Sequence, residues 1–361
     1  MHLTEILSLR PVTAGGMYLA LTRRCPLTCA HCSTNSLMTS QEHDADMFAR
    51  FVDTLRVDDR PELLYLTGGE ALLRPELVRD ITLRAHAVGA RVALLSGMFF
   101  ARQDTIPIAI RRAIAEVDHF AASLDIFHER QVARTSVFAA MRRLLDEGKD
   151  LSFQVTGIDE DDPYLADVTE AIRQAFDDRV PVLVAKLGAV GRAKEWYSQE
   201  HGRGNPHPSA YLAPDPCAMA TWPTVAFDGT IVACCNQDAV DGKAPPHLRL
   251  GHAAADTWPT VRARCESSTL LRAVRVHGPR YLQANFGSQA AACDGYCDAC
   301  FKLSNDPSIV ERLEPVMASP GMRLLEAQVA VWQQQTLARR YGVGRYADLV
   351  SLGLPTTEAA A

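Results

Sequence analysis

The stretch MYLALTRRCPLTCAHC, residues 17–32, joins an alternating apolar run to three cysteines with C-x3-C-x2-C spacing. Residues 17–22 alternate in the manner of a β-strand, so a strand is expected to lead directly into the cysteine loop. A structural zinc normally takes four protein ligands, and a disulfide framework needs an even number of cysteines. Three thiols on one short loop therefore indicate a metal centre that keeps one coordination position open.

The first 190 residues repeat the step from strand to helix about six times. Further strands are expected in the runs 62–70, 91–97, 118–126, 151–159 and 180–188, and helices in 41–57, 74–89, 106–117, 136–148 and 164–178. This alternation predicts an α/β fold, a parallel sheet or partial barrel with helices outside. Functional groups of such folds gather at the C-terminal ends of the strands. The residues expected there are Cys25, Gly68, Ser96, Asp125, Thr156 and Gly191.

The composition is that of a globular chain that buries a sizeable core. The 361 residues are 47% hydrophobic and 22% charged, and the net charge of -6 gives no reason to expect nucleic-acid or anionic-membrane binding. No run of about 18 apolar residues occurs, and the first residues lack the pattern of a secretory signal. Ten cysteines without an export signal favour metal binding over disulfides, and a reducing cytoplasm as the location.

The amino-acid composition changes after about residue 199. Residues 198–216 are rich in Pro, Gly and polar residues and are expected to form a linker. Residues 224–235 contain a DG turn between two alternating runs, which predicts a β-hairpin. We expect a core domain over 1–198, a smaller cysteine-rich domain over 199–305, and a helical tail over 306–361.

The cysteine loop resembles the C-x3-C-x-φ-C loop of radical S-adenosylmethionine (SAM) enzymes, which follows the first barrel strand in that family. The resemblance implies a partial (β/α)6 barrel similar to a TIM barrel, and a [4Fe-4S] cluster held by Cys25, Cys29 and Cys32. The fourth iron of such a cluster is free to bind SAM. His31 stands where the family has an aromatic residue, and its ring could pack near the adenine.

Three further segments resemble SAM-binding segments of this family, and each follows an expected strand. TGGE at 67–70 is similar to the GGE motif, whose backbone and carboxylate meet the SAM amino group. GAVGRAKE at 188–195 is similar to the G-R-A segment that lies against the adenine, and SLD at 123–125 takes the place of polar residues near the ribose or the substrate. The SAM-binding residues implied in this way are His31, Gly68, Gly69, Glu70, Ser96, Ser123, Gln154, Gly191 and Arg192.

The later cysteines resemble the auxiliary-cluster domains called SPASM and twitch. Cys217 and Cys234 flank Gly229 with the spacing that opens these domains, and Cys297 and Cys300 supply a C-x2-C pair. A full SPASM domain has a longer train of cysteines, so the resemblance favours one auxiliary [4Fe-4S] cluster over two. The implied ligands are drawn from Cys217, Cys234, Cys293, Cys297 and Cys300. Cys235 is an alternative to Cys234, and Cys293 to either of the last pair.

Other readings of these residues stay open. The first loop could bind zinc with His31 as a fourth ligand, and the second group could form a zinc ribbon. Asp125 and His128 could contact the substrate, as catalytic residues, or bond within the barrel rim, and the same holds for Gln154 and Thr156. In an epimerase, a spare thiol must return the hydrogen, and Cys235 and Cys265 are then the catalytic candidates. Cys265 lies in an expected helix, where a passive cysteine is more usual.

The resemblance implies reductive cleavage of SAM to a 5'-deoxyadenosyl radical, which abstracts hydrogen from a C–H bond. We expect a ribosomal peptide or another natural-product intermediate as the substrate, with the auxiliary cluster assisting. Oxidation or epimerisation of a sugar or aminoglycoside-type small molecule is the alternative reaction. A zinc-binding interaction protein is the alternative of another class. The expected partners are the substrate and an electron donor such as flavodoxin or ferredoxin.

Overall fold

The computed structural model describes residues 1–201, 214–288, 293 and 295–355, and these contain one mixed β-sheet. The strands follow one another in the order β6-β5-β4-β3-β2-β1-β7-β8-β9. Strands β1 to β6 are Gly16–Ala20, Leu63–Thr67, Arg91–Ser96, His119–Leu124, Leu151–Gly157 and Val182–Lys186. Neighbours among these six are parallel, and the sheet does not close on itself. The predicted α/β fold with a partial, six-stranded parallel barrel is confirmed.

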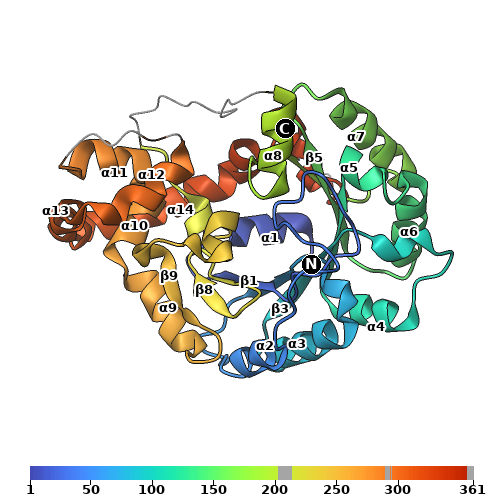
Figure 1. The fold of residues 1–361 in the computed structure, drawn as a ribbon, viewed down its shortest axis with the longest axis horizontal. Helices are drawn as coiled ribbons and strands as arrows, with labels where there is room; N and C mark the ends of the chain where they lie inside the picture. The colour runs from blue at the N-terminus through green and yellow to red at the C-terminus, as the bar shows by residue number, and fades with distance from the viewer. Residues whose placement is uncertain (202–213, 289–292, 294, 356–361) are drawn as a thin grey trace.

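Helices cover the outer side of the parallel strands (Figure 1). They are α2 (Asp46–Val52), α3 (Pro75–Ala87), α4 (Ile108–Glu116), α5 (Ile126–Glu129), α6 (Arg134–Asp146), α7 (Pro163–Phe176) and α8 (Arg192–His201). The sequence of helix α3 explains where this helix begins and ends. Pro75 begins it without losing a hydrogen bond, and Gly89 follows it with a φ of +82°, which glycine adopts at little cost. Its buried face includes Val78, Ile81 and Ala85.

The N-terminal helix α1 (Leu3–Leu9) lies at the end of the barrel opposite the cysteine loop. Its Ile6 packs with Leu63, Tyr65, Ala93 and Trp222, side chains that face the interior of the sheet. This apolar cluster fills one end of the barrel, so that the C-terminal ends of the strands form the accessible end.

The cysteine-rich region continues the same sheet. Strand β7 (Thr224–Val225) pairs in parallel with β1, and β8 (Thr230–Val232) and β9 (Arg249–His252) add antiparallel strands at this edge. The predicted hairpin is confirmed, with Asp228 and Gly229 in its turn. Four helices follow, α9 (Trp258–Ser267), α10 (Thr269–His277), α11 (Pro279–Phe286) and α12 (Tyr296–Lys302). Most of the predicted linker, residues 202–213, lies outside the described residues.

The C-terminal helices connect the two sides of the molecule. They are α13 (Pro307–Met317) and α14 (Pro320–Tyr341), and α14 also contacts α1. After α14 the Val343 amide donates to the Val184 carbonyl of β6 at 2.9 Å, so this segment covers the outer edge of the sheet. The predicted helical tail is therefore present, and it protects the strand edge that the open barrel leaves.

Short helical turns complete the chain. They are η1 (Ala71–Leu73), η2 (Phe99–Arg102), η3 (Ala218–Ala220), η4 (Ala239–Lys243), η5 (Pro246–Leu248), η6 (Leu303–Asn305) and η7 (Gly344–Ser351). Among the described residues, no helix combines the length and the apolar character needed to cross a bilayer.

Candidate functional site

The three cysteines of the loop after β1 line one cavity at the C-terminal ends of the strands. The cavity has a volume of about 320 Å³ and includes Cys25, Cys29 and Cys32 in its wall. All three thiols are free, and the first two are buried. Burial raises the pKa of Cys25 to about 12, and the charges of Glu70 and the neighbouring thiols add to the effect. Three crowded thiols of this kind fit a cationic metal cluster, because a metal deprotonates a coordinating thiol outright.

The glycines that follow β2 allow its end to pack against the cysteine loop. A Cβ atom on Gly68 would lie 2.6 Å from the Thr22 carbonyl oxygen, and one on Gly69 would lie 2.4 Å from the Arg24 carbonyl oxygen. The Gly69 amide donates to Thr22 O at 2.7 Å. Both glycines also line the cavity, so this turn packs against the cysteine loop and forms part of the cavity wall.

Glu70 is buried and joins the ends of two strands. Its carboxylate accepts hydrogen bonds from the Leu72 amide at 3.1 Å, the Ser96 hydroxyl at 3.0 Å and the Gly97 amide at 2.9 Å. Burial raises the pKa of Glu70 to about 7 although these donors oppose the shift. Glu70 and Ser96 are thus bonded to each other, whereas Gly97 lines the cavity beside them. With one donor on Oε1 and two on Oε2, the carboxylate keeps acceptor capacity for a further donor such as an ammonium group.

Asp125 holds two histidines at the rim of the cavity. Its carboxylate caps α5, accepting from the Phe127 and His128 amides, both at 2.9 Å. Its Oδ2 also contacts His31 Nε2 at 2.9 Å and His128 Nδ1 at 2.6 Å. Burial opposes ionisation of Asp125, but the imidazoles outweigh it and hold its pKa well below the usual range. Burial alone would lower the pKa of His128, but the charge of Asp125 outweighs burial, and the pKa of His128 is raised.

The same three side chains form a group that could hold a metal ion. One ligand atom from each of His31, Asp125 and His128 lies within 4.8 Å of the others. The ring of His31 stacks on Phe127 with centroids 4.5 Å apart, and its Nδ1 is buried without a hydrogen-bond partner. The structure therefore brings the predicted residues Asp125 and His128 to the cavity, and places His31 between the cysteine loop and α5.

Polar side chains from β4, β5 and β6 complete the wall. Ser123, Gln154, Thr156 and Lys186 all line the cavity. Gln154 Nε2 donates to the Tyr65 hydroxyl at 2.5 Å, and Lys186 Nζ lies 2.7 Å from a Glu160 carboxylate oxygen. Sequence reasoning missed Lys186, although its position at the end of the sixth strand was the available signal. This side of the cavity offers several hydrogen-bond donors and one cation to a bound molecule.

The predicted adenine segment fastens the cysteine loop. Gly191 has a φ of +58°, and a Cβ there would lie 2.2 Å from the Ser33 carbonyl oxygen. The Arg192 amide donates to Cys32 O at 2.9 Å, and its Nε donates to Cys29 O at 3.0 Å. Arg192 also lines the cavity, so the segment after β6 both contacts the cysteine loop and forms part of the cavity wall.

Gln131 is a further clamp on the loop that the sequence did not reveal. Its side-chain oxygen accepts from the Thr28 amide at 2.8 Å, and its Nε2 donates to Cys29 Sγ at 3.3 Å. The contact joins positions 102 residues apart in the chain, and no local pattern marks Gln131 as special.

Four of the later cysteines form a second group. Cys217 precedes η3, Cys234 follows β8, and Cys297 and Cys300 share α12. Burial raises the pKa of all four thiols and is the largest cause of each shift. In each of the six pairs among them, the charge of one sulfur also raises the pKa of the other. The pKa of Cys297 is raised to about 11. Four thiols that disfavour one another's ionisation also fit a cationic centre.

The remaining cysteines lie outside both groups of ligands or at their margin. Cys293 donates to Gln283 Oε1 at 3.0 Å. Cys235 is exposed beside the second group, and Arg10 Nη2 lies 3.6 Å from its sulfur. Cys265 is fully buried, 3.0 Å from Arg275 Nη2. Neither Cys235 nor Cys265 is among the residues that line the cavity.

The comparison with protein families agrees with this arrangement. Residues 19–179 match the radical SAM superfamily model. Two similar solved structures are native anSMEcpe with bound AdoMet and the Cp18Cys peptide, with a TM-score of 0.48, and histidine-tagged anSMEcpe with bound AdoMet, with a TM-score of 0.49. Each is 10% identical and covers 90% of this chain and 99% of its own. No curated protein matches the sequence. Residues 19–179, which carry the end of β1, the cysteine loop and strands β2 to β5, are therefore similar to a radical SAM domain.

Proposed function

We propose that this protein is a radical SAM enzyme that removes a hydrogen atom from a C–H bond of a ribosomal peptide or another natural-product intermediate. The observation that carries the proposal is the convergence of the cysteine loop and the ends of β2 to β6 on one cavity of about 320 Å³. A radical SAM domain implies SAM and one [4Fe-4S] cluster, and the three free thiols are suitable ligands for it.

The chain's own residues divide the work at this site. Cys25, Cys29 and Cys32 would hold the cluster, which, once reduced, supplies the electron that cleaves SAM into methionine and a carbon radical. Gln131 and Arg192 keep the loop in place through its sulfur and its carbonyl groups. Restricting the loop in this way keeps the reacting groups in register, since a displacement of about 1 Å costs rate steeply.

The substrate side of the cavity is the wall formed by β4, β5 and β6. Gln154 and Thr156 offer hydrogen bonds there, and Lys186 offers an ammonium group that also forms an ion pair with Glu160 at 2.7 Å. These groups suit a substrate rich in carbonyl or carboxylate oxygens, such as a peptide. A sugar or aminoglycoside-type substrate would meet a cation with hydroxyl or amino groups, which is the poorer match.

The second cysteine group supports an auxiliary [4Fe-4S] cluster bound by Cys217, Cys234, Cys297 and Cys300. Adjacent side chains connect this group with the cavity: Gln154 bonds to Tyr65, whose ring lies 5.3 Å from that of Tyr18. The guanidinium of Arg10 lies 5.3 Å from the Tyr18 ring centroid and within 3.6 Å of Cys235. This series of contacts links the wall of the cavity to Cys235, which lies beside the second group.

Iron analysis of matched cysteine variants tests both parts of the proposal. After anaerobic reconstitution with iron and sulfide, we expect about eight irons per chain, in two [4Fe-4S] clusters. Cys29→Ala should lose about four irons together with formation of 5'-deoxyadenosine, whereas Cys300→Ala should lose about four irons and keep some cleavage of SAM. Cys293→Ala is the matched control and should keep all the iron. A colourless protein that holds zinc and leaves SAM intact would refute the proposal.

A further inference from the structure

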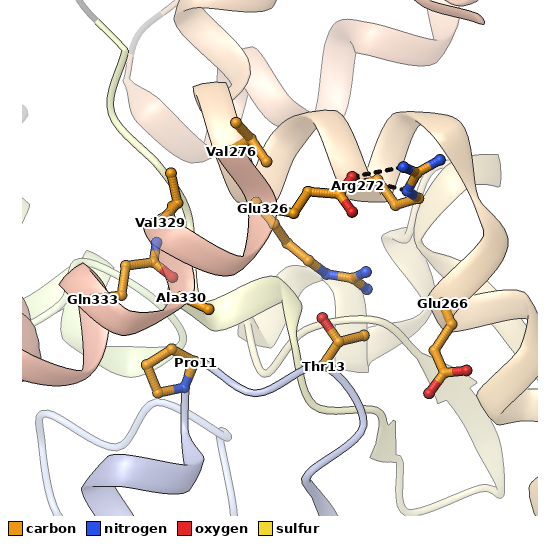
Figure 2. A pocket seen from close by; sticks show the side chains of 10 residues that line it. Pro11, Thr13, Glu266, Arg272, Val276, Glu326, Val329, Ala330 and Gln333 are labelled. Carbon is orange, nitrogen blue, oxygen red and sulfur yellow. Dashed lines mark hydrogen bonds and ion pairs between the residues drawn. The ribbon is translucent and has the colours of Figure 1, made fainter. Parts of the chain in front are cut away.

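A second cavity lies far from the cysteine loop, between helices α10 and α14 and the segment that joins α1 to β1 (Figure 2). Its volume is about 240 Å³, and its wall includes Thr13, Arg272, Arg275, Glu326 and Gln333. None of the residues discussed for SAM or for the two cysteine groups lines it. The helix that forms its wall does contact the second cysteine group, because the Cys217 amide donates to the Val274 carbonyl at 3.2 Å, one residue before Arg275.

Arg275 places a buried positive charge at this cavity without an acidic partner. Only 7% of its surface is exposed, and its described hydrogen bonds are to uncharged groups. Nε donates to the Ala220 carbonyl at 2.7 Å, and Nη2 donates to the Cys265 sulfur at 3.0 Å. The Cys265 sulfur also lies 3.8 Å from the Thr221 carbonyl oxygen, and burial raises the pKa of this thiol despite the nearby guanidinium. The position of Arg275 in the last turn of α10 offsets its charge only in part.

The carboxylates around the cavity are paired with other arginines. Glu326 contacts Arg272 through Nε at 2.9 Å and Nη2 at 2.8 Å, and Figure 2 shows this pair at the edge of the cavity. Glu266 contacts Arg262 at 2.8 Å, one helical turn away on α9. The two acids are therefore neutralised, and the local charge that is left is that of Arg275. An unpaired buried charge is costly, so a negatively charged occupant would be strongly favoured.

Gln333 supplies a second, independent sign of a missing partner. Its side chain is 2% exposed and lines the cavity, and its Nε2 has no hydrogen-bond partner. A buried donor without a partner costs about 1–3 kcal/mol in a typical protein, and such groups are rare. Arg275 and Gln333 come from two helices that face each other across the same space, and both are hydrogen-bond donors.

We propose that this cavity binds a small oxyanion between Arg275 and Gln333. A guanidinium and an amide N–H are the donors that carboxylate and phosphate oxygens accept from. The volume of about 240 Å³ limits the ligand to a small organic acid or an inorganic anion. This cavity shares no lining residue with the cavity of the cysteine loop, so anion binding can be tested separately from the proposed enzymatic function.

The test uses thermal unfolding of the reconstituted protein with sodium acetate, sodium phosphate or sodium chloride at equal ionic strength. Acetate or phosphate should raise Tm by roughly 2 °C at a tenfold excess over Kd, and chloride should not. Acetate acting alone would assign a carboxylate, and phosphate acting alone would assign a phosphate-bearing ligand. Equal effects of all three salts would overturn the site.

Gln333→Glu provides the decisive variant, because it places a carboxylate in the wall of the cavity that Arg275 also lines. We expect its Tm without added anion to exceed that of the wild type, and the response to acetate and phosphate to disappear. Gln335→Glu on the same helix is the matched control, since this side chain is exposed and the charge change is the same. Arg275→Met should also remove the response. A Gln333→Glu protein that still responds to the anions as the wild type does would contradict the proposal.

Discussion

Replacing Gly191 by alanine should displace the cysteine loop and reduce its capacity to hold iron. A Cβ at this position would lie 2.2 Å from Ser33 O and 2.6 Å from Cys32 O, both backbone atoms of the loop. Restoring ordinary contact requires a movement of roughly 1 Å, because non-bonded atoms are normally about 3.5 Å apart. Cys32 itself would be carried along with its carbonyl group.

The expected energy has two parts that a matched variant separates. The φ of +58° costs alanine about 1–2 kcal/mol, and overpacking of this kind costs about 1–3 kcal/mol more. Gly148 has a φ of +82°, but nothing lies within 4 Å of the Cβ that a substitution would add. Gly148→Ala therefore carries the backbone strain alone, at about 1–2 kcal/mol.

The assay compares urea unfolding and iron content of the two variants after identical anaerobic reconstitution. We expect Gly191→Ala to be about 1–3 kcal/mol less stable than Gly148→Ala and to lose iron from the first site. Gly148→Ala should bind iron as the wild type does. Equal stability of the two variants, or full iron content in Gly191→Ala, would show that this glycine does not fasten the loop.

Three further substitutions test other parts of the structure. Asp125→Asn removes the charge that anchors two imidazoles, and should cost about 3–5 kcal/mol in urea unfolding; a loss below about 1 kcal/mol would contradict this role. Burial lowers the pKa of His119 from 6.5 to about 4, so the unfolded chain binds a proton that the folded chain refuses, and stability falls as the pH drops from about 6.5 to about 4. Between pH 7 and pH 5 this residue should contribute about 2 kcal/mol of that loss, which His119→Gln should abolish; an unchanged slope against pH would count against it. Gln131→Leu leaves the Thr28 amide without its acceptor and should lower iron retention during gel filtration, with Gln174→Leu, at an exposed position on α7, as the control.

The sequence predicted those features that local patterns determine. The hydrophobic periodicity predicted the six parallel strands and helix α3, and the DG dipeptide predicted the β7–β8 hairpin. The residues at the strand ends followed from one topological rule, since the C-terminal ends of parallel strands meet on one side of a sheet. Cys25, Gly68, Asp125 and Thr156 all line the cavity for that reason.

Contacts between distant segments could not be predicted in this way. The bonds of His31 to Asp125 and of Gln131 to Cys29 join a loop to residues about a hundred positions away, where ordinary side chains carry no local signal. The bond from the Gly97 amide to the Glu70 carboxylate was likewise not predicted, and it forms because β2 and β3 are neighbours in the sheet. Nor did composition reveal that the cysteine-rich region extends the edge of β1, since the pairing of β7 involves only two residues.

The most direct test of the central claim is formation of 5'-deoxyadenosine by the anaerobically reconstituted protein with SAM and dithionite. We predict measurable formation by the wild type and none by Cys25→Ala, Cys29→Ala or Cys32→Ala, while Cys265→Ala, outside both cysteine groups, retains it. Formation that persists in the three loop variants, or a fully iron-loaded wild type that leaves SAM intact, would contradict the claim that this loop holds the cluster at which SAM is cleaved.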